Sequence, residues 1–204
     1  MIFHYAGKYS GDENDLPRRE HPENAVPFRE PEDMKKLSLV ANIGATVVTL
    51  ALLAGVGLIL HGQHPDRVPL LQMYIGLLAS FLTLFPHELL HAICFKKDVY
   101  MYTNLKQGLL FVVGPEDMSK GRFIVMSLLP NLVFGFVPYL LFLFLPGCPW
   151  LGVFGGMCIG MGFGDYINVF NAACQMPRGA RTYLSGMHSY WFMPGAAKSA
   201  EEKE

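Results

Sequence analysis

The residues best suited to chemistry are His87, Glu88 and His91, which belong to the run His87-Glu88-Leu89-Leu90-His91. On a helix, positions four apart face the same way, so both imidazoles can reach one metal ion. Glu88 lies about 100° further round the helix and can reach a water molecule at the metal without binding the metal. This pattern predicts zinc ligands at His87 and His91 and a catalytic acid/base at Glu88.

The motif lies within residues 70–95, a stretch that is otherwise apolar. Histidine and glutamate side chains are costly to bury in a membrane helix, so an intramembrane functional site is the default interpretation. The alternative is a helix whose histidines only form hydrogen bonds to neighbouring helices.

The composition is that of a membrane protein. The chain has 204 residues, of which 51% are hydrophobic and 16% are charged, and its mean hydropathy is +0.28. These values favour a small polytopic protein in contact with the lipid bilayer over a soluble domain. The net charge of −1 argues against a nucleic-acid partner. No oligomeric state follows from the sequence.

Four apolar runs are each long enough to cross a bilayer core of about 30 Å. The expected helices cover residues 37–60, 70–95, 123–145 and 150–174. Between the second and third runs, two β-prone stretches predict a short hairpin, residues 99–103 and 109–113. The predicted fold is therefore an all-α membrane protein with four transmembrane helices and a short cytoplasmic β-hairpin between helices 2 and 3.

This pattern divides the chain into three parts. Residues 1–36 form an extended or weakly ordered N-terminal arm, residues 37–176 a membrane metalloprotease-like domain, and residues 177–204 a C-terminal tail. Six of the sixteen lysines and arginines lie in the arm, five in residues 96–122 and four in the tail. The positive-inside rule then predicts a multi-pass cell-membrane protein with both termini cytoplasmic.

A catalytic zinc ion usually has three protein ligands, and the third is expected at the same membrane depth as the first two. In the predicted topology the second and fourth helices run in the same direction. His87 lies roughly 26 Å along the second and Asp165 roughly 22 Å along the fourth. Asp165 is the only acid in the fourth run and is predicted to be the third ligand.

The fourth run also carries a regular glycine pattern. Gly152, Gly156, Gly160 and Gly164 recur every four residues, directly before Asp165. They predict a smooth face that another helix can approach closely. A packing role alone is possible, with Asp165 paired to a cation. However, none of the four apolar runs contains a lysine or arginine, so a metal explains the buried carboxylate better.

Two asparagines are candidates for contacts to a substrate or to the ligands themselves. Asn131 follows Pro130 at a depth level with the motif, where a proline frees a backbone carbonyl. Asn131 adds one donor group and one acceptor. Asn168 lies one turn beyond Asp165. A simple helix kink at Pro130 is the competing explanation.

Together, the five-residue motif, the following hairpin, the proline-bearing helix and the Gly164-Asp165 pair resemble the putative zincin peptidase family of small membrane proteins of unknown function. The chain is more distantly similar to the site-2 proteases. The resemblance implies a membrane-embedded zinc metalloprotease in which His87, His91 and Asp165 bind Zn²⁺ and Glu88 is the catalytic acid/base.

The leading hypothesis is therefore a zinc-dependent membrane-embedded metalloprotease that hydrolyses peptide bonds of membrane or membrane-proximal proteins. The alternative is a non-catalytic zinc-binding scaffold or regulator that binds a partner through the glycine face. A small transporter is a third interpretation, but the four predicted helices show no internal repeat.

Overall fold

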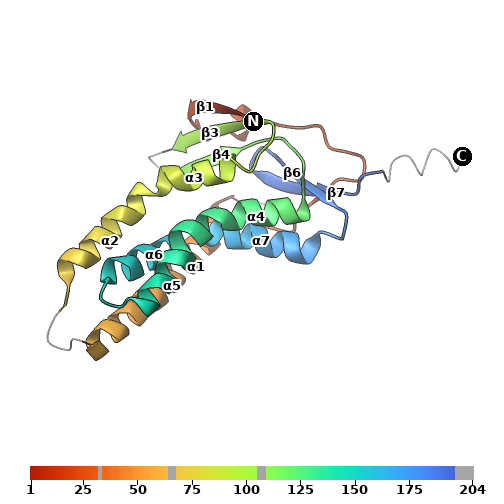
Figure 1. Cartoon of the computed structure of the whole chain (residues 1–204). Coiled ribbons are helices and arrows are strands. Elements are labelled where there is room, and N and C mark those ends of the chain that lie inside the picture. The colour runs from red at the N-terminus through yellow and green to blue at the C-terminus, as the bar shows by residue number, and fades with distance from the viewer. Residues whose placement is uncertain (32–33, 64–67, 105–108, 196–204) are drawn as a thin grey trace, which may run out of the picture. The chain divides into compact units, whose positions relative to one another are not determined.

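The structure, a computed structural model, describes residues 1–31, 34–63, 68–104 and 109–195 (Figure 1). The chain divides into two compact units. The sheet unit comprises Met1–Glu30, Glu88–Met126 and Asn168–Glu204, and the helical unit comprises Pro31–His87 and Ser127–Ile167.

The helical unit contains most of the apolar sequence. Its elements are α1 (Met34–Gln63), α2 (Leu70–Leu82), the π-helix η2 (Asn131–Phe136), α5 (Val137–Phe144) and α6 (Pro149–Met161). Three further helices begin in one unit and end in the other: α3 (Leu84–Ala92), α4 (Lys120–Pro130) and α7 (Phe163–Gln175).

Two to four helices are suited to cross a membrane. Lys36–Gln63 and Lys120–Phe144 each have the necessary length and apolar composition. The expected helices 70–95 and 150–174 are instead bent pairs, α2 with α3 at 42° and α6 with α7 at 52°. They add two spans if each bent pair counts as one. Outward-facing leucines such as Leu58 and Leu71, both 74% exposed, fit contact with lipid.

Local hydrogen bonding explains the first bend. The Thr83 hydroxyl donates to the Ser80 carbonyl at 2.6 Å, and the Thr83 backbone N–H donates to the same oxygen. In a continuous helix that oxygen would accept from the N–H four residues later, so the threonine competes with the helical pattern. The helix ends at Leu82, and α3 begins again at Leu84.

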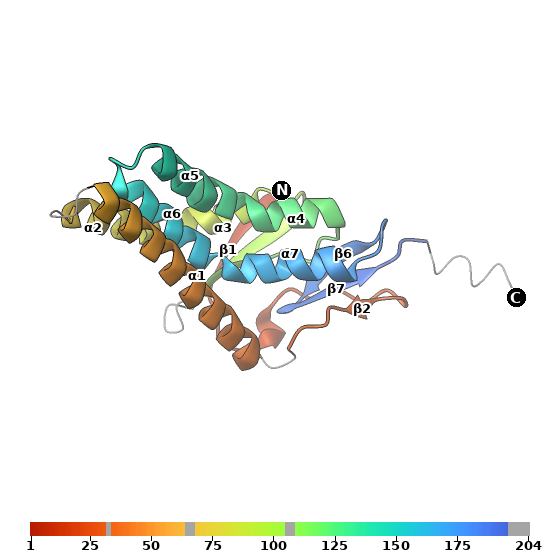
Figure 2. The same ribbon diagram turned by 90° about the horizontal axis from the view of Figure 1, so that it is seen from below.

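The glycine face of α6 packs inside the helical unit, where α6 contacts α1, α2 and α5 (Figure 2). A side chain at Gly152 would meet Phe142 and Val56, and one at Gly160 would collide with Thr49. These glycines therefore permit close helix packing within the chain.

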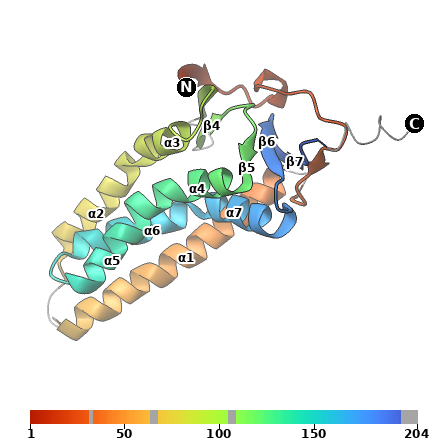
Figure 3. The same ribbon diagram turned by 45° about the vertical axis from the view of Figure 1, so that its right-hand side comes forward.

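The sheet unit contains two small sheets. The first has the order β1-β3-β4, with β1 (Ile2–Lys8), β3 (Asp98–Asn104) and β4 (Leu109–Val113). The second has the order β2-β7-β6-β5, with β2 (Val26–Pro27), β7 (His188–Phe192), β6 (Arg181–Ser185) and β5 (Met118–Ser119). Figure 3 shows β5, β6 and β7 side by side.

The predicted hairpin corresponds to β3 and β4, which pair antiparallel with Tyr100 opposite Val113. The residues between them, 105–108, lie outside the described part of the chain. The side of the membrane on which the hairpin lies stays a prediction.

The chain is mostly helical, but the all-α prediction was wrong at both ends. Within the expected arm, β1 pairs parallel to β3, with Ile2 opposite Asp98 (Figure 1). Within the expected tail, β6 and β7 form a hairpin; residues 196–204 lie outside the described part. These strands pair with partners far away in sequence or have few residues, so local patterns give them little signal.

The end of α3 is part of the sheet unit's core. Ala92 and Phe95 are buried together with Val99, Phe123 and Met126. Because this cluster surrounds the last turn of α3, it fixes the part of the helix that carries His91.

Candidate metal centre

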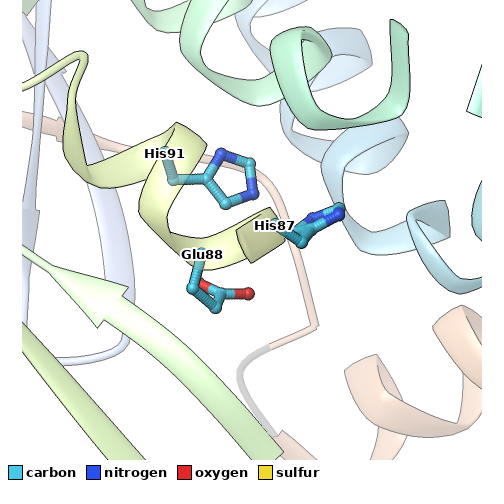
Figure 4. Close-up of side chains that lie close together, drawn as sticks. All are labelled: His87, Glu88 and His91. Atoms are coloured by element: carbon cyan, nitrogen blue, oxygen red, sulfur yellow. The ribbon is translucent and has the colours of Figure 1, made fainter. Parts of the chain in front are cut away.

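The His-Glu-x-x-His motif lies on α3, as the sequence predicts. His87, Glu88 and His91 each offer one ligand atom, and these three atoms lie within 4.8 Å of one another. The side chains project to the same side of the helix (Figure 4). His91 is buried, and the other two are half-buried. The group is therefore close enough to act on one ion and its water.

His91 is oriented by a backbone carbonyl. Its Nδ1 lies 2.9 Å from the carbonyl oxygen of Met126. A carbonyl can only accept, so Nδ1 carries the proton and the ring lone pair is on Nε2. Histidines that bind metals usually donate their other ring N–H in this way, which fixes the tautomer and the ring plane. His91 is thus prepared to bind a metal through Nε2.

His87 lies beside Asp165 in the helical unit. Its Nε2 is 3.2 Å from Asp165 Oδ2, and the two side chains are 19% and 14% exposed. Two ligand atoms on one tetrahedral zinc ion, each about 2.1 Å from the metal, are separated by about 3.4 Å. The observed separation suits either two ligands of one ion or a direct hydrogen bond. The structure therefore brings together two residues that lie 78 positions apart in the sequence.

Asn131 contacts the same carboxylate. Its Nδ2 donates to Asp165 Oδ2 at 2.7 Å, and its Oδ1 accepts from the Tyr166 hydroxyl at 3.1 Å. Asn131 is only 1% exposed. A side chain at Gly162 would collide with its amide group, so this glycine makes room for it. The Asn131 amide group therefore has a partner at each end, Asp165 for its N–H and Tyr166 for its oxygen.

The π-helix explains how Asn131 reaches this place. Pro130 lacks an N–H group, and the wider π-helical turn begins directly after it. Such π-helical turns occur frequently at functional sites. Within the described part of the chain, Asn168 shares no hydrogen bond with His87, Asp165 or Asn131. It is half-buried on α7.

The segment after α3 is fixed by an ion pair. Arg122 donates from Nε and one terminal nitrogen to the Cys94 carbonyl, at 2.8 and 2.6 Å, and from its other terminal nitrogen to Glu116 at 2.6 Å. Glu116 accepts from the backbone N–H groups of Lys96 and Lys97, at 2.6 and 2.8 Å. Burial raises the pKa of Glu116, but Arg122 and the two backbone donors outweigh it, and the net pKa lies below its ordinary value.

Sequence reasoning missed Tyr166, Gly162 and the Met126 carbonyl. Tyr166 directly follows Asp165, so proximity in sequence was an available signal. No residue type marks a backbone carbonyl as a partner for His91. The collision that requires glycine at position 162 follows only from the bend between α6 and α7.

The residues fit a zinc ion. Two imidazoles on one helix face, one of them with its tautomer set by a backbone acceptor, and a nearby carboxylate are the donor types of catalytic zinc sites. The three mutually close ligand atoms belong to His87, Glu88 and His91, and Asp165 contacts His87 without belonging to that group.

The chain is mostly helical, has two to four helices long and apolar enough to cross a membrane, and carries a zincin-type motif on a short helix. Residues 80–181, half of the chain, match the family described as "Putative zincin peptidase", and the chain belongs to that family. A search of curated proteins and a search of solved structures each found no match. The family assignment therefore depends on the sequence that includes α3, α4, α6 and α7.

Proposed function

We propose that this protein is a zinc-dependent, membrane-embedded metalloprotease that cleaves membrane or membrane-proximal proteins. The observation that carries the proposal is the hydrogen bond from His91 Nδ1 to the Met126 carbonyl. It prepares Nε2 for a metal, on the same helix that carries Glu88.

His87, His91 and Asp165 hold the metal in this proposal. The 3.2 Å separation of His87 and Asp165 supports a shared ion. When bound, zinc supplies Lewis acidity toward a peptide carbonyl and lowers the pKa of a nearby water. Asn131 orients Asp165 through the 2.7 Å hydrogen bond to Oδ2, the same oxygen that lies beside His87 Nε2.

Glu88 moves the proton. Its carboxylate accepts a proton from the water that attacks the peptide carbonyl, and it then donates that proton to the departing amine. Its half-buried position gives it access to both the site and water. Glu88 does not need to bind the metal for this role.

The substrate is a peptide in extended form, because an intact helix shields its carbonyls. Among the residues that the structure describes, strand β4 is at the edge of the sheet β1-β3-β4 and pairs with β3. An extended peptide can add to such an edge through backbone hydrogen bonds. We place the hairpin and both termini on the cytoplasmic side, as the distribution of lysine and arginine predicts.

The scaffold alternative loses one of its supports. It requires the glycine face of α6 to bind a partner, but Gly152 and Gly160 pack against side chains of α1 and α5 within the same chain. Substitutions on this face should therefore disturb the helical unit itself.

The decisive experiment compares wild type with Glu88→Gln in detergent. We expect about one zinc per chain in both proteins by elemental analysis. Cleavage of an unstructured protein or of single-span membrane peptides, followed by mass spectrometry, should fall about 10² to 10⁴-fold in the variant. Glu20→Gln, an exposed change, is the control. Full cleavage by Glu88→Gln would refute the mechanism, and zinc without any cleavage by wild type would favour the scaffold.

A further inference from the structure

A polar cavity lies in the sheet unit and contains none of the residues of the metal centre. Its volume is about 330 Å³, and it is lined by the segment before β2 and by the β6–β7 hairpin. The lining residues are Arg18, Arg19, His21, Ser185, His188 and Tyr190. Two arginines and two histidines are thus among the lining residues, and no acidic residue is.

The guanidinium group of Arg19 is held in a fixed position. It lies over the rings of Tyr183 and Phe192, 4.8 and 5.4 Å from their centroids. It also donates to Asp117 at 3.0 Å. Asp117 additionally accepts from Arg181, so one carboxylate serves two guanidinium groups. An excess positive charge remains beside the cavity.

Arg18 adds to this excess. It is exposed, and no carboxylate in the described part of the chain pairs with it. Glu30 is the acid that approaches from the other side, 3.8 Å from His188 Nδ1. The lining residues themselves therefore carry two positive charges with both histidines neutral, and the exposed Glu20 and Glu23 lie in the same segment outside the lining.

The aromatic wall is also ordered. His21 Nδ1 lies 2.8 Å from the Tyr183 hydroxyl, and the His21 ring lies 4.3 Å from the Tyr190 ring, centroid to centroid. A guanidinium group can donate two parallel hydrogen bonds to the oxygens of a phosphate group. An aromatic side chain can pack against an organic group that is attached to the phosphate. The cavity is larger than a bare phosphate ion needs and is in the usual range for small organic ligands.

We propose that this cavity binds the phosphate group of an organic phosphate ester. The ester can be a soluble molecule or the headgroup of an anionic lipid, since β6 begins only a short loop after the end of α7. The site acts independently of the metal centre.

The test is isothermal titration calorimetry of the full chain in a non-ionic detergent at constant ionic strength. The titrants are inorganic phosphate, glycerol 3-phosphate and dihexanoyl-phosphatidylglycerol. We expect saturable binding of at least one ester. Similar affinity for glycerol 3-phosphate and the lipid identifies a soluble phosphate as sufficient, and binding of the lipid alone identifies a headgroup site.

Matched variants locate the binding. Arg18→Gln should weaken it about tenfold or more, as expected for loss of a charged hydrogen bond. Arg178→Gln, an exposed change outside the cavity, should leave the affinity within about twofold. Equal weakening by both variants, or no saturable binding by wild type, would overturn the proposal. Unchanged binding by a zinc-free His87→Ala protein separates this result from the fate of the proposed protease.

Discussion

The two units hold the two histidines of the motif by different means. In the helical unit, His87 lies beside Asp165, and Asp165 accepts from the side chain of Asn131. In the sheet unit, His91 donates to the backbone carbonyl of Met126. The end of its helix is held by Arg122 and Glu116, whose partners include backbone groups of residues 94, 96 and 97.

This difference follows from the surroundings of each unit. Within apolar helices the backbone groups bond to one another, so a polar side chain must find another polar side chain. Around the end of α3 the chain leaves the helix and exposes backbone groups that a charged side chain can bind. The helical unit thus supports its histidine with a network that point substitutions can dissect. The sheet unit supports its histidine with contacts that substitutions reach only indirectly.

The largest expected effect comes from removing either histidine. His87→Ala and His91→Ala should each lose the stoichiometric zinc of wild type, since the remaining donors are too few for a catalytic site. Elemental analysis after chelator-free purification measures this. If both variants kept one zinc per chain, neither His87 nor His91 would be a zinc ligand.

The next effect concerns the sheet unit alone. Glu116→Ala removes a buried partner of Arg122 and of two backbone N–H groups, which should reduce the unit's local stability by about 2 to 4 kcal/mol. Hydrogen exchange at Lys96 and Lys97 reports the opening. Glu20→Ala, an exposed control, should stay within about 0.5 kcal/mol. An equal change in both variants would show that the ion pair does not anchor the end of α3.

Acid should affect the same anchor in wild type. The pKa of Glu116 is depressed below its ordinary value of 4.5 in the folded state. Its contribution to stability is therefore fully present above about pH 4.5 and is lost as the pH falls through the depressed value. Protection at Lys96 and Lys97 should decline over that acidic range, and Glu116→Ala should remove this part of the decline.

The sequence predicted the surroundings of His87 in the helical unit better than those of His91 in the sheet unit. The motif and Asp165 are chemical types that are rare in apolar runs, and a depth argument was enough to link His87 with Asp165. The same argument placed Asn131 at this depth, and the structure shows it in contact with Asp165, while its role at the site stays a prediction. The sheet unit gave weaker signals, because parallel pairing of β1 with β3 spans more than 90 residues and a backbone carbonyl has no residue type. The bends at Thr83 and Gly162 depended on single hydrogen bonds and contacts, which helix periodicity does not reveal.

Asn131 tests whether the network in the helical unit orients a ligand. Asn131→Leu keeps the number and branching of the side-chain heavy atoms and removes the 2.7 Å hydrogen bond to Asp165. Loss of a residue that orients a ligand typically lowers metal affinity about 10 to 100-fold. Zinc competition with a chromogenic chelator measures this, and Asn168→Leu is the matched control on α7. Equal affinity of Asn131→Leu and wild type would limit Asn131 to helix packing.

The smallest effect is expected at the outer end of the network. Tyr166→Phe removes only the hydroxyl that donates to Asn131 Oδ1 at 3.1 Å and leaves the bond from Asn131 to Asp165 in place. A single hydrogen bond of this kind contributes about 1 kcal/mol, so zinc affinity should fall less than about tenfold. The same chelator competition applies. If Tyr166→Phe lowered zinc affinity as much as Asn131→Leu does, Tyr166 would hold the Asn131 amide in its functional orientation. The loss of zinc affinity would then not decline with distance from the ligands.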